Sequence, residues 1–218
     1  MQKTHLLNYT TTEQFDHGMK VAALAYQVGQ QLQLSEETCG DLILAGIMHD
    51  VGKISLQSEM EANQSMIVEE MGYIRQHPQR GYKIMKDRGF REEACEMVLY
   101  HHENWDGSGY PYNQEGRNIP LGACILRVCD VFCALTDNRS YRDAYTIDRA
   151  LELMIREIKN FDVRVFMALQ QLLHDDEDGR LRIPECPIDL RGEFRKYGIE
   201  EKTGYWYEGH SAPGDGDS

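Results

Sequence analysis

Long apolar runs are missing from this 218-residue sequence. The longest, LILAGIM at residues 42–48, falls far short of the roughly 20 apolar residues that a membrane-spanning helix needs. The first residues, MQKTHLLNYTTTEQ, contain no apolar core of a secretion signal. We therefore expect one ordinary domain with some additional chain, located in the cytosol and without a membrane partner.

Positive charge is also scarce. The 23 basic residues face 36 acidic ones, which gives a net charge of −13. A broad basic surface that could bind a nucleic-acid polymer or an anionic membrane is therefore excluded. A small phosphate ligand stays open, because bound cations can supply positive charge locally.

Cysteine is present but forms no recognisable framework. The six cysteines, at positions 39, 95, 124, 129, 133 and 186, contain no C-x-x-C pair, and a chain of this size needs no disulfides to be stable. We expect free thiols. Cys129 and Cys133 are one helical turn apart, which is compatible with a metal clip but more typical of small buried apolar residues.

Alternating strand patterns are nearly absent before residue 180, so the fold class is predicted to be all-α. Residues 55–66 are polar and are interpreted as a surface loop or lid. Helical periodicity and capping residues predict helices at 13–32, from the cap Ser35 to 47, from Pro78 onwards, at 91–102, at 120–136, at 147–159 after Thr146, and at 163–174 after Asp162.

Histidines and acidic residues lie on the apolar faces of these helices. Glu13 and His17 are four residues apart at the head of an apolar stripe, although such a pair also occurs at exposed helix ends. His49 and Asp50 close the second helix in line with its apolar rows. Burying an unpaired aspartate costs several kcal/mol, and a divalent cation beside a histidine is a common compensation. Lys53 adds a cation within reach of an anionic substrate.

Two further features belong to the same pattern. His101 and His102 end a helix, and consecutive helical residues point about 100° apart. Both imidazoles can face one cation only where the helix stops, and the glycine-rich sequence WDGSGYP supplies that turn. Asp130 lies in mid-helix on an apolar face, which requires a metal, an arginine such as Arg127, or a buried donor. His77 alone is typical of an exposed cap residue.

A single polynuclear metal site would account for all of these positions. Neutral imidazoles and carboxylates form a ligand set that suits iron, manganese or zinc. Clustered cations generate hydroxide from water near neutral pH and stabilise phosphoryl oxygens during in-line displacement. The residues therefore predict the hydrolysis of a phosphate ester.

The order of these motifs resembles the HD-GYP family of bacterial cyclic-dinucleotide phosphodiesterases over about residues 5–172. The compound motif HHENWDGSGYP is highly specific, whereas a His-Asp pair alone is not. The positions that carry the resemblance are His17, His49-Asp50-x-x-Lys53, His77-Pro78, His101-His102-Glu103, Gly109-Tyr110-Pro111, Asp130 and Arg139-x-Tyr141-Arg142.

The resemblance implies a helical bundle of the HD type at residues 1–174, followed by an acidic loop and an irregular C-terminal tail at 175–218. It implies hydrolysis of cyclic di-GMP to linear pGpG, in some members continuing to GMP. The implied cofactors are two or three divalent ions, with iron or manganese favoured. A homodimer or a signalling protein is the implied partner besides the cyclic dinucleotide.

The resemblance also implies individual roles. The implied catalytic residues are Asp50 and Lys53: a metal-bridging hydroxide would attack phosphorus beside Asp50, with Lys53 on a phosphate oxygen. Substrate contacts would come from Lys53, Tyr110, Arg139 and Arg142, with Tyr110 in the GYP loop that resembles a wall of the site. The implied ligands are His17, His49, Asp50 and Asp130 for one ion; Asp50, His77, His101 and His102 for a second; and Glu13 for a third.

The chain departs from the family pattern in three places. SEMEANQSMIVEE stands where a Lys-Pro-Gly turn is usual, and Ser140 and Val163 stand where proline is common. The first departure changes the region that resembles a lid over the substrate. Two alternatives therefore stay beside the main hypothesis: a sensor that binds a cyclic dinucleotide without hydrolysing it, and a hydrolase of another cyclic dinucleotide such as cyclic GMP-AMP.

Overall fold

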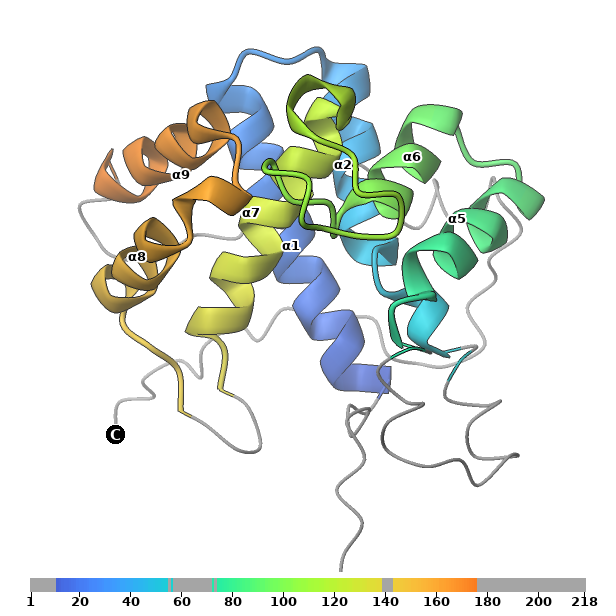
Figure 1. Ribbon diagram of the computed structural model, residues 1–218, viewed down its shortest axis with the longest axis horizontal. Coiled ribbons are helices and arrows are strands. Elements are labelled where there is room, and N and C mark those ends of the chain that lie inside the picture. Colours follow the sequence, from blue (N-terminus) through green and yellow to red (C-terminus); the bar gives the residue numbers. More distant parts are fainter. Residues whose placement is uncertain (1–10, 55, 57–71, 73, 139–142, 176–218) are drawn as a thin grey trace, which may run out of the picture.

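The computed structural model describes residues 11–54, 56, 72, 74–138 and 143–175 (Figure 1). The described residues form helices and no strand, apart from an isolated bridge between Asp106 and Glu115, so the all-α prediction is confirmed. The helices are α1 (Thr11–Gln31), α2 (Glu36–Met48), α5 (His77–Asp87), α6 (Glu92–Tyr100), α7 (Leu121–Thr136), α8 (Ile147–Arg156) and α9 (Val163–Asp175), with short 3-10 turns η1 (Gly116–Asn118) and η2 (Ile158–Asn160).

The helix boundaries follow from local capping. The Ser35 hydroxyl accepts a hydrogen bond from the backbone N–H of Thr38, and Thr146 does the same for Arg149, as expected for helix caps. Several predicted boundaries differ from the observed ones by one to three residues; α6, for example, ends at Tyr100 and not at residue 102. Helix α5 begins at His77 with Pro78 in its first turn, and α8 ends at Arg156, followed by η2.

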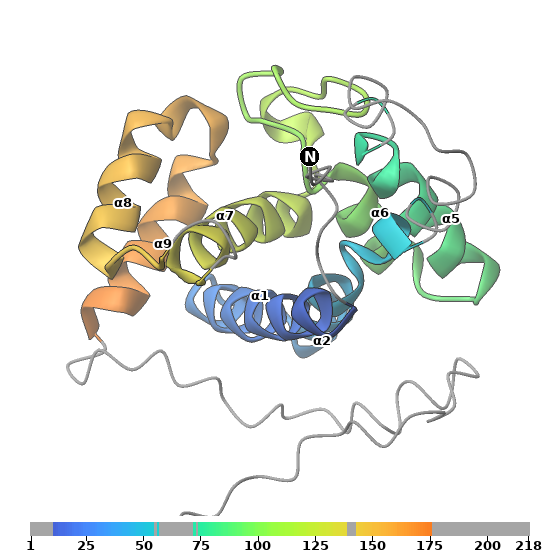
Figure 2. The same ribbon diagram turned by 90° about the horizontal axis from the view of Figure 1, so that it is seen from below.

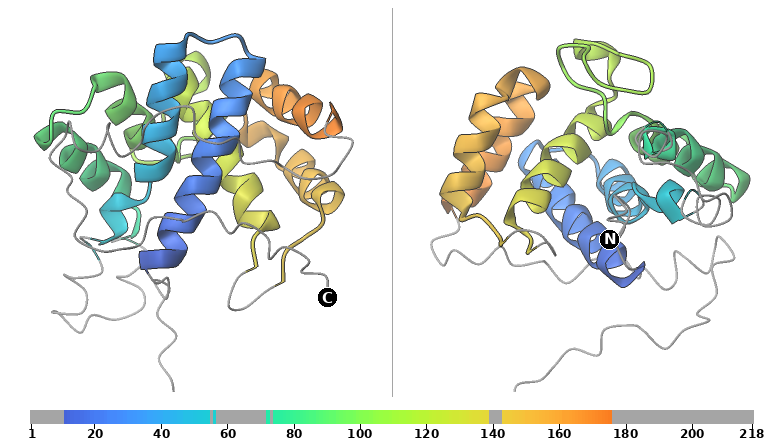
Figure 3. Two further views of the ribbon diagram at one scale, coloured as in Figure 1. Left: turned by 180° about the vertical axis from the view of Figure 1, so that it is seen from behind. Right: turned by 60° about the horizontal axis from the view of Figure 1, so that its bottom comes forward.

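Helices α1, α2 and α7 form the centre of the molecule, with α5 and α6 on one side and α8 and α9 on the other (Figures 1 and 2). Seen from behind, α1 and α2 run side by side (Figure 3). The main core lies between these elements and includes Leu24, Leu42, Leu126 and Phe132, each at most 2% exposed. A core of this kind fixes the helices and therefore the polar residues at their ends.

Several predictions concern residues that lie outside the described part of the structure. They concern the 55–66 segment except for Leu56, and the irregular tail from residue 176 onwards. Leu56 itself is fully buried, so the surface-loop prediction fails at this residue. The described cysteines, at positions 39, 95, 124, 129 and 133, are buried and free, while Cys186 lies outside the description. No described helix has the length and apolarity needed to cross a membrane.

Candidate metal centre

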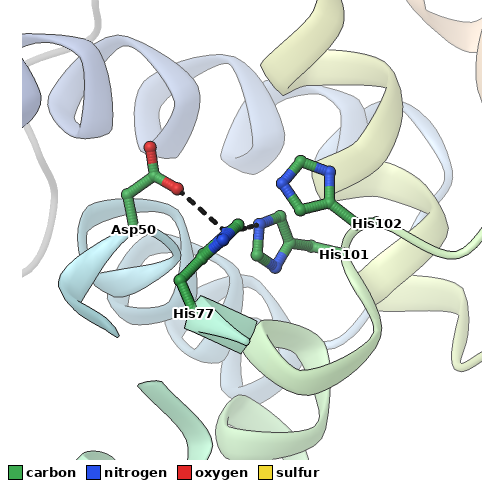
Figure 4. A group of neighbouring side chains, drawn as sticks. All are labelled: Asp50, His77, His101 and His102. Atoms are coloured by element: carbon green, nitrogen blue, oxygen red, sulfur yellow. Dashed lines mark hydrogen bonds and ion pairs between the residues drawn. The ribbon is translucent and has the colours of Figure 1, made fainter. Parts of the chain in front are cut away.

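Seven of the eight predicted metal ligands come together at the ends of α2, α5 and α6 and on the facing sides of α1 and α7. The ligand atoms within each group lie no more than 4.8 Å from one another. We call the two groups the α1 group and the α5 group. The α1 group is His17, His49 and Asp130, and the α5 group is Asp50, His77, His101 and His102 (Figure 4).

Helix termini position most of these side chains. His49 is the C-cap of α2 and His101 the C-cap of α6, while His77 is the first residue of α5. Gly52 keeps the segment after Asp50 against α5, because a Cβ on Gly52 would lie 2.0 Å from the carbonyl oxygen of His77. Only glycine permits this approach, so the segment carrying Asp50 and the start of α5 share one rigid contact.

Three of the histidines are held in the same way. Each ring Nδ1 lies within hydrogen-bonding distance of a backbone carbonyl three residues earlier. Because a carbonyl only accepts, Nδ1 carries the hydrogen, and in the neutral ring Nε2 carries the exposed lone pair. These pairs are His49 with Gly46 at 2.7 Å, His77 with Ile74 at 2.6 Å, and His101 with Val98 at 2.7 Å.

The contact between His77 and His101 suits a bound cation. Their Nε2 atoms are 3.2 Å apart, and both rings are fully buried (Figure 4). Burial lowers the pKa of His77 to about 4 and holds that of His101 well below its usual value. Both rings are therefore neutral at pH 7, and two lone pairs face each other. A metal ion that accepts both would turn this repulsion into ligation.

Asp50 lies between the two groups. Its Oδ1 is 3.3 Å from Nε2 of His77, and its Oδ2 is 3.4 Å from Nε2 of His49 and 2.6 Å from the Lys53 ammonium. Burial acts to raise the pKa of Asp50, but Lys53 and His49 outweigh it and hold the pKa well below the usual range. Within the described part of the chain, no hydrogen bond reaches Asp50 Oδ1 or His49 Nε2. Such buried atoms suit divalent cations.

His17 differs from the three histidines above because its Nδ1 faces a carboxylate and not a backbone carbonyl. Its Nε2 is 3.0 Å from Asp130 Oδ1, and its Nδ1 is 3.3 Å from Asp137 Oδ2. Burial lowers the pKa of His17, but the hydrogen bonds to Asp130 and Asp137 raise it to about 9. Asp130 is affected in return: burial raises its pKa, and His17 holds it well below the usual range. Without metal, a proton therefore occupies the α1 group.

The loop that follows His102 is held by a buried carboxylate. The Glu103 side chain accepts the backbone N–H groups of Tyr112 and Gln114 at 2.7 and 3.1 Å, and only 2% of the residue is exposed. Gly109 packs so closely against this turn that a Cβ would lie 2.2 Å from the backbone nitrogen of Asn104. The loop is thereby fixed against the end of α6.

Tyr110 forms one wall of the α5 group. Its ring stacks on His102, with centroids 4.8 Å apart and planes inclined by 27°. The guanidinium of Arg75 lies over the Tyr110 ring, 5.4 Å from its centroid. The three side chains form a stack of cation, phenol and imidazole at the edge of the ligand group.

The remaining predicted residues are placed as follows. Glu13 lies one turn before His17 on α1, is exposed, and belongs to neither ligand group. Lys53 lies beside Asp50, as described above. Arg139 and Arg142 lie outside the described residues. The exposed-cap interpretation of His77 is wrong, because the side chain is fully buried.

Of the partners predicted for Asp130, the buried donor is confirmed in His17, the arginine is wrong, and Asp137 is a further residue of the site. The arginine proposed for Asp130, Arg127, contacts Asn104 Oδ1 at 3.0 and 3.1 Å and His102 Nδ1 at 3.5 Å. Asp137 was not identified. Its signal is the spacing of seven residues, about two helical turns, which places Asp137 at the end of α7 on the same side as Asp130.

The comparisons with known proteins place this chain among HD domain proteins. A sequence model of the HD domain matches residues 1–165. The cyclic di-GMP phosphodiesterase response regulator RpfG of Xanthomonas campestris is 37% identical over 69% of this chain and 41% of its own length. A 3'3'-cGAMP-specific phosphodiesterase of Vibrio cholerae is 30% identical over 80% of this chain and 41% of its own length.

A solved structure shares the fold. An HDG"Y"P protein of Bdellovibrio bacteriovorus aligns with a TM-score of 0.60 at 19% identity, over 77% of this chain and 55% of that one. This chain spans less than half the length of the curated relatives that it matches. The resemblance to the HD-GYP phosphodiesterases is confirmed, and the chain belongs to the HD domain family.

Proposed function

We propose that this chain hydrolyses one phosphodiester bond of cyclic di-GMP to give linear pGpG, with divalent cations held by the α1 and α5 groups. The observation that carries the proposal is the pair of neutral imidazole lone pairs, His77 and His101, directed at each other beside the low-pKa carboxylate of Asp50. Curated relatives named as cyclic di-GMP phosphodiesterases support the choice of substrate.

The ligands proposed for the two cations follow the two groups. His17, His49 and Asp130 would hold one cation, His77, His101 and His102 the other, and Asp50 would contact both. When bound, the cations supply Lewis acidity toward phosphoryl oxygens and lower the pKa of water. We further propose iron or manganese as the metal, because both accept mixed imidazole and carboxylate ligands.

The protein residues have complementary roles in this proposal. Lys53 would neutralise a phosphoryl oxygen next to Asp50, and Tyr110 would fix the wall against which the substrate lies. Arg139 and Arg142 would bind the second phosphate, and Glu13 would join a third cation. Four further points remain proposals: the site residues, the domain boundary at residue 174, the cytosolic location, and a homodimer or signalling protein as partner. Free buried cysteines support the cytosol.

A related hydrolase activity has a specific observation in its favour. A relative of which the chain covers 41% is named as specific for 3'3'-cGAMP, and the segment that resembles a substrate lid departs from the family pattern. Cyclic GMP-AMP is therefore the second candidate substrate. A sensor without turnover is the third candidate, which the ligand set disfavours.

The proposal can be tested with protein purified anaerobically. We would count bound metals, incubate the protein with cyclic di-GMP or 3'3'-cGAMP, and separate the products by chromatography. We expect pGpG from the metal-loaded wild type, none from a His101→Ala/His102→Ala variant, and unchanged turnover in His174→Ala, an exposed histidine on α9. If product forms from 3'3'-cGAMP alone, 3'3'-cGAMP would replace cyclic di-GMP as the proposed substrate. Two bound metals without product would favour the sensor, and no metal after reconstitution would refute the proposal.

A further inference from the structure

We propose that Asp137 is a positioning residue that orients His17 toward the cation of the α1 group and has no such effect on the α5 group. The inference rests on the proposed metal centre. It assigns a role to a residue that follows α7 and lies outside both ligand groups.

The need for such a residue follows from the position of His17 in its helix. His49 and His101 follow the last turn of a helix, where backbone carbonyls lack partners within the helix. His77 begins α5 and uses a backbone carbonyl that precedes that helix. His17 lies in the interior of α1, where the carbonyls one turn earlier are used by the helix itself. Its Nδ1 therefore requires an acceptor from another element, and Asp137 supplies one.

Asp137 is itself held in place. Its Oδ2 is 3.3 Å from His17 Nδ1, while its Oδ1 accepts a hydrogen bond from the Lys20 ammonium. The Asp137 side chain is only 13% exposed. Lys20 lies three residues after His17 on the same face of α1. Its ammonium group therefore fixes the Asp137 carboxylate, which in turn fixes the His17 imidazole.

This arrangement has two consequences for His17 as a ligand. The carboxylate keeps the hydrogen on Nδ1 once a cation displaces the proton from Nε2, so the tautomer that can bind metal is selected. It also increases the basicity of Nε2. Removing such a partner of a metal-binding histidine typically weakens metal affinity about 10- to 100-fold.

Metal affinity tests the inference without relying on catalysis. We would titrate the metal-free protein with Mn²⁺ in a calorimeter, using His77→Gln to isolate the α1 group and His17→Gln to isolate the α5 group. In the His77→Gln background, Asp137→Ala should weaken Mn²⁺ binding about 10- to 100-fold. In the His17→Gln background, the same substitution should leave the remaining affinity unchanged.

Two further variants separate positioning from a general structural role. Asp137→Asn keeps an oxygen that can accept the Nδ1 hydrogen but removes the charge, so we expect an effect smaller than that of alanine. Asp87→Asn changes an exposed aspartate at the end of α5 and should change neither affinity. Circular dichroism would check that each variant is folded.

Three outcomes would overturn the inference: no loss of affinity in Asp137→Ala, an equal loss at both groups, or a full loss in Asp137→Asn accompanied by unfolding. The test is separable from the proposed function. If Asp137→Ala weakens only the α1 group while the wild type turns over no cyclic dinucleotide, the positioning role stands and the proposed activity fails. If the wild type turns over a cyclic dinucleotide but Asp137→Ala leaves both Mn²⁺ affinities unchanged, the proposed activity stands and the positioning role fails.

Discussion

The two ligand groups use the same residue types but differ in how His17 of the α1 group is held. In the α5 group, His77 and His101 donate to backbone carbonyls, are fully buried, and have pKa values lowered by burial. In the α1 group, His17 donates to side-chain carboxylates, which raise its pKa to about 9 against the effect of burial. A carbonyl leaves the imidazole neutral and ready for a metal, whereas carboxylates let a proton occupy the site when metal is absent.

The largest effect is expected where the two groups meet. Asp50 contacts His49 of the α1 group and His77 of the α5 group. Asp50→Ala should therefore weaken metal binding at both groups. We expect turnover to fall at least about 1000-fold, equivalent to about 4 kcal/mol of transition-state stabilisation. Metal analysis and product chromatography would measure this. Retention of both metals would show that Asp50 is not shared.

Substitution of one histidine from each group should separate the groups. His17→Gln and His77→Gln should each lose about one metal per chain, because each removes one of few ligands, and each should reduce turnover about 100-fold or more. The measurement is metal content by emission spectroscopy together with kcat. Loss of both metals in either variant would mean that the two positions fill only together.

The pH dependence of metal-free stability should differ for the two groups. The folded pKa of His17 is raised to about 9, so its contribution is complete below pH 6.5 and is lost as the pH rises through 9. The folded pKa of His77 is lowered to about 4, so stability is lost as the pH falls from 6.5 toward 4. The His17 contribution is at most about 3 kcal/mol.

Urea unfolding of the metal-free protein between pH 5 and 9 would test these opposite signs. His17→Gln should flatten the alkaline side of the profile and leave the acidic side unchanged. His77→Gln should reduce the acidic side only in part, because burial also lowers the pKa of His101 and His102. An alkaline decline that persists in His17→Gln would contradict the assignment.

A smaller effect is expected from the loop beside the α5 group. Glu103→Ala leaves the buried N–H groups of Tyr112 and Gln114 without their acceptor, which should cost about 2 kcal/mol and lower Tm by about 4–8 °C. Glu103→Gln retains an acceptor oxygen and should lose less. Calorimetry with Mn²⁺ should show weaker binding at the α5 group alone, and equal weakening of both groups would argue against a local role.

Local patterns in the sequence were sufficient for the helices and for the convergence of most candidate ligands. Ser35 and Thr146 cap helices as predicted, because capping depends on residues three positions apart. Partners across helices could not be predicted in the same way. Arg127 contacts Asn104, and Asp137 contacts His17, because of how α7 crosses the neighbouring elements. That crossing is decided by packing over the whole core.

The smallest effect is expected from the hydroxyl of Tyr110. The contact with the α5 group is made by the ring, which stacks on His102 at 4.8 Å, and stacked aromatic pairs contribute about 0.5–1.5 kcal/mol. Tyr110→Phe keeps the stack, so kcat/KM should change less than about threefold, whereas Tyr110→Ala should lower it about tenfold. Steady-state kinetics with both variants would measure this. If Tyr110→Phe lowers kcat/KM as much as Tyr110→Ala does, the hydroxyl contacts the substrate. Tyr110 would then act through a polar contact and not through the stack of its ring on His102.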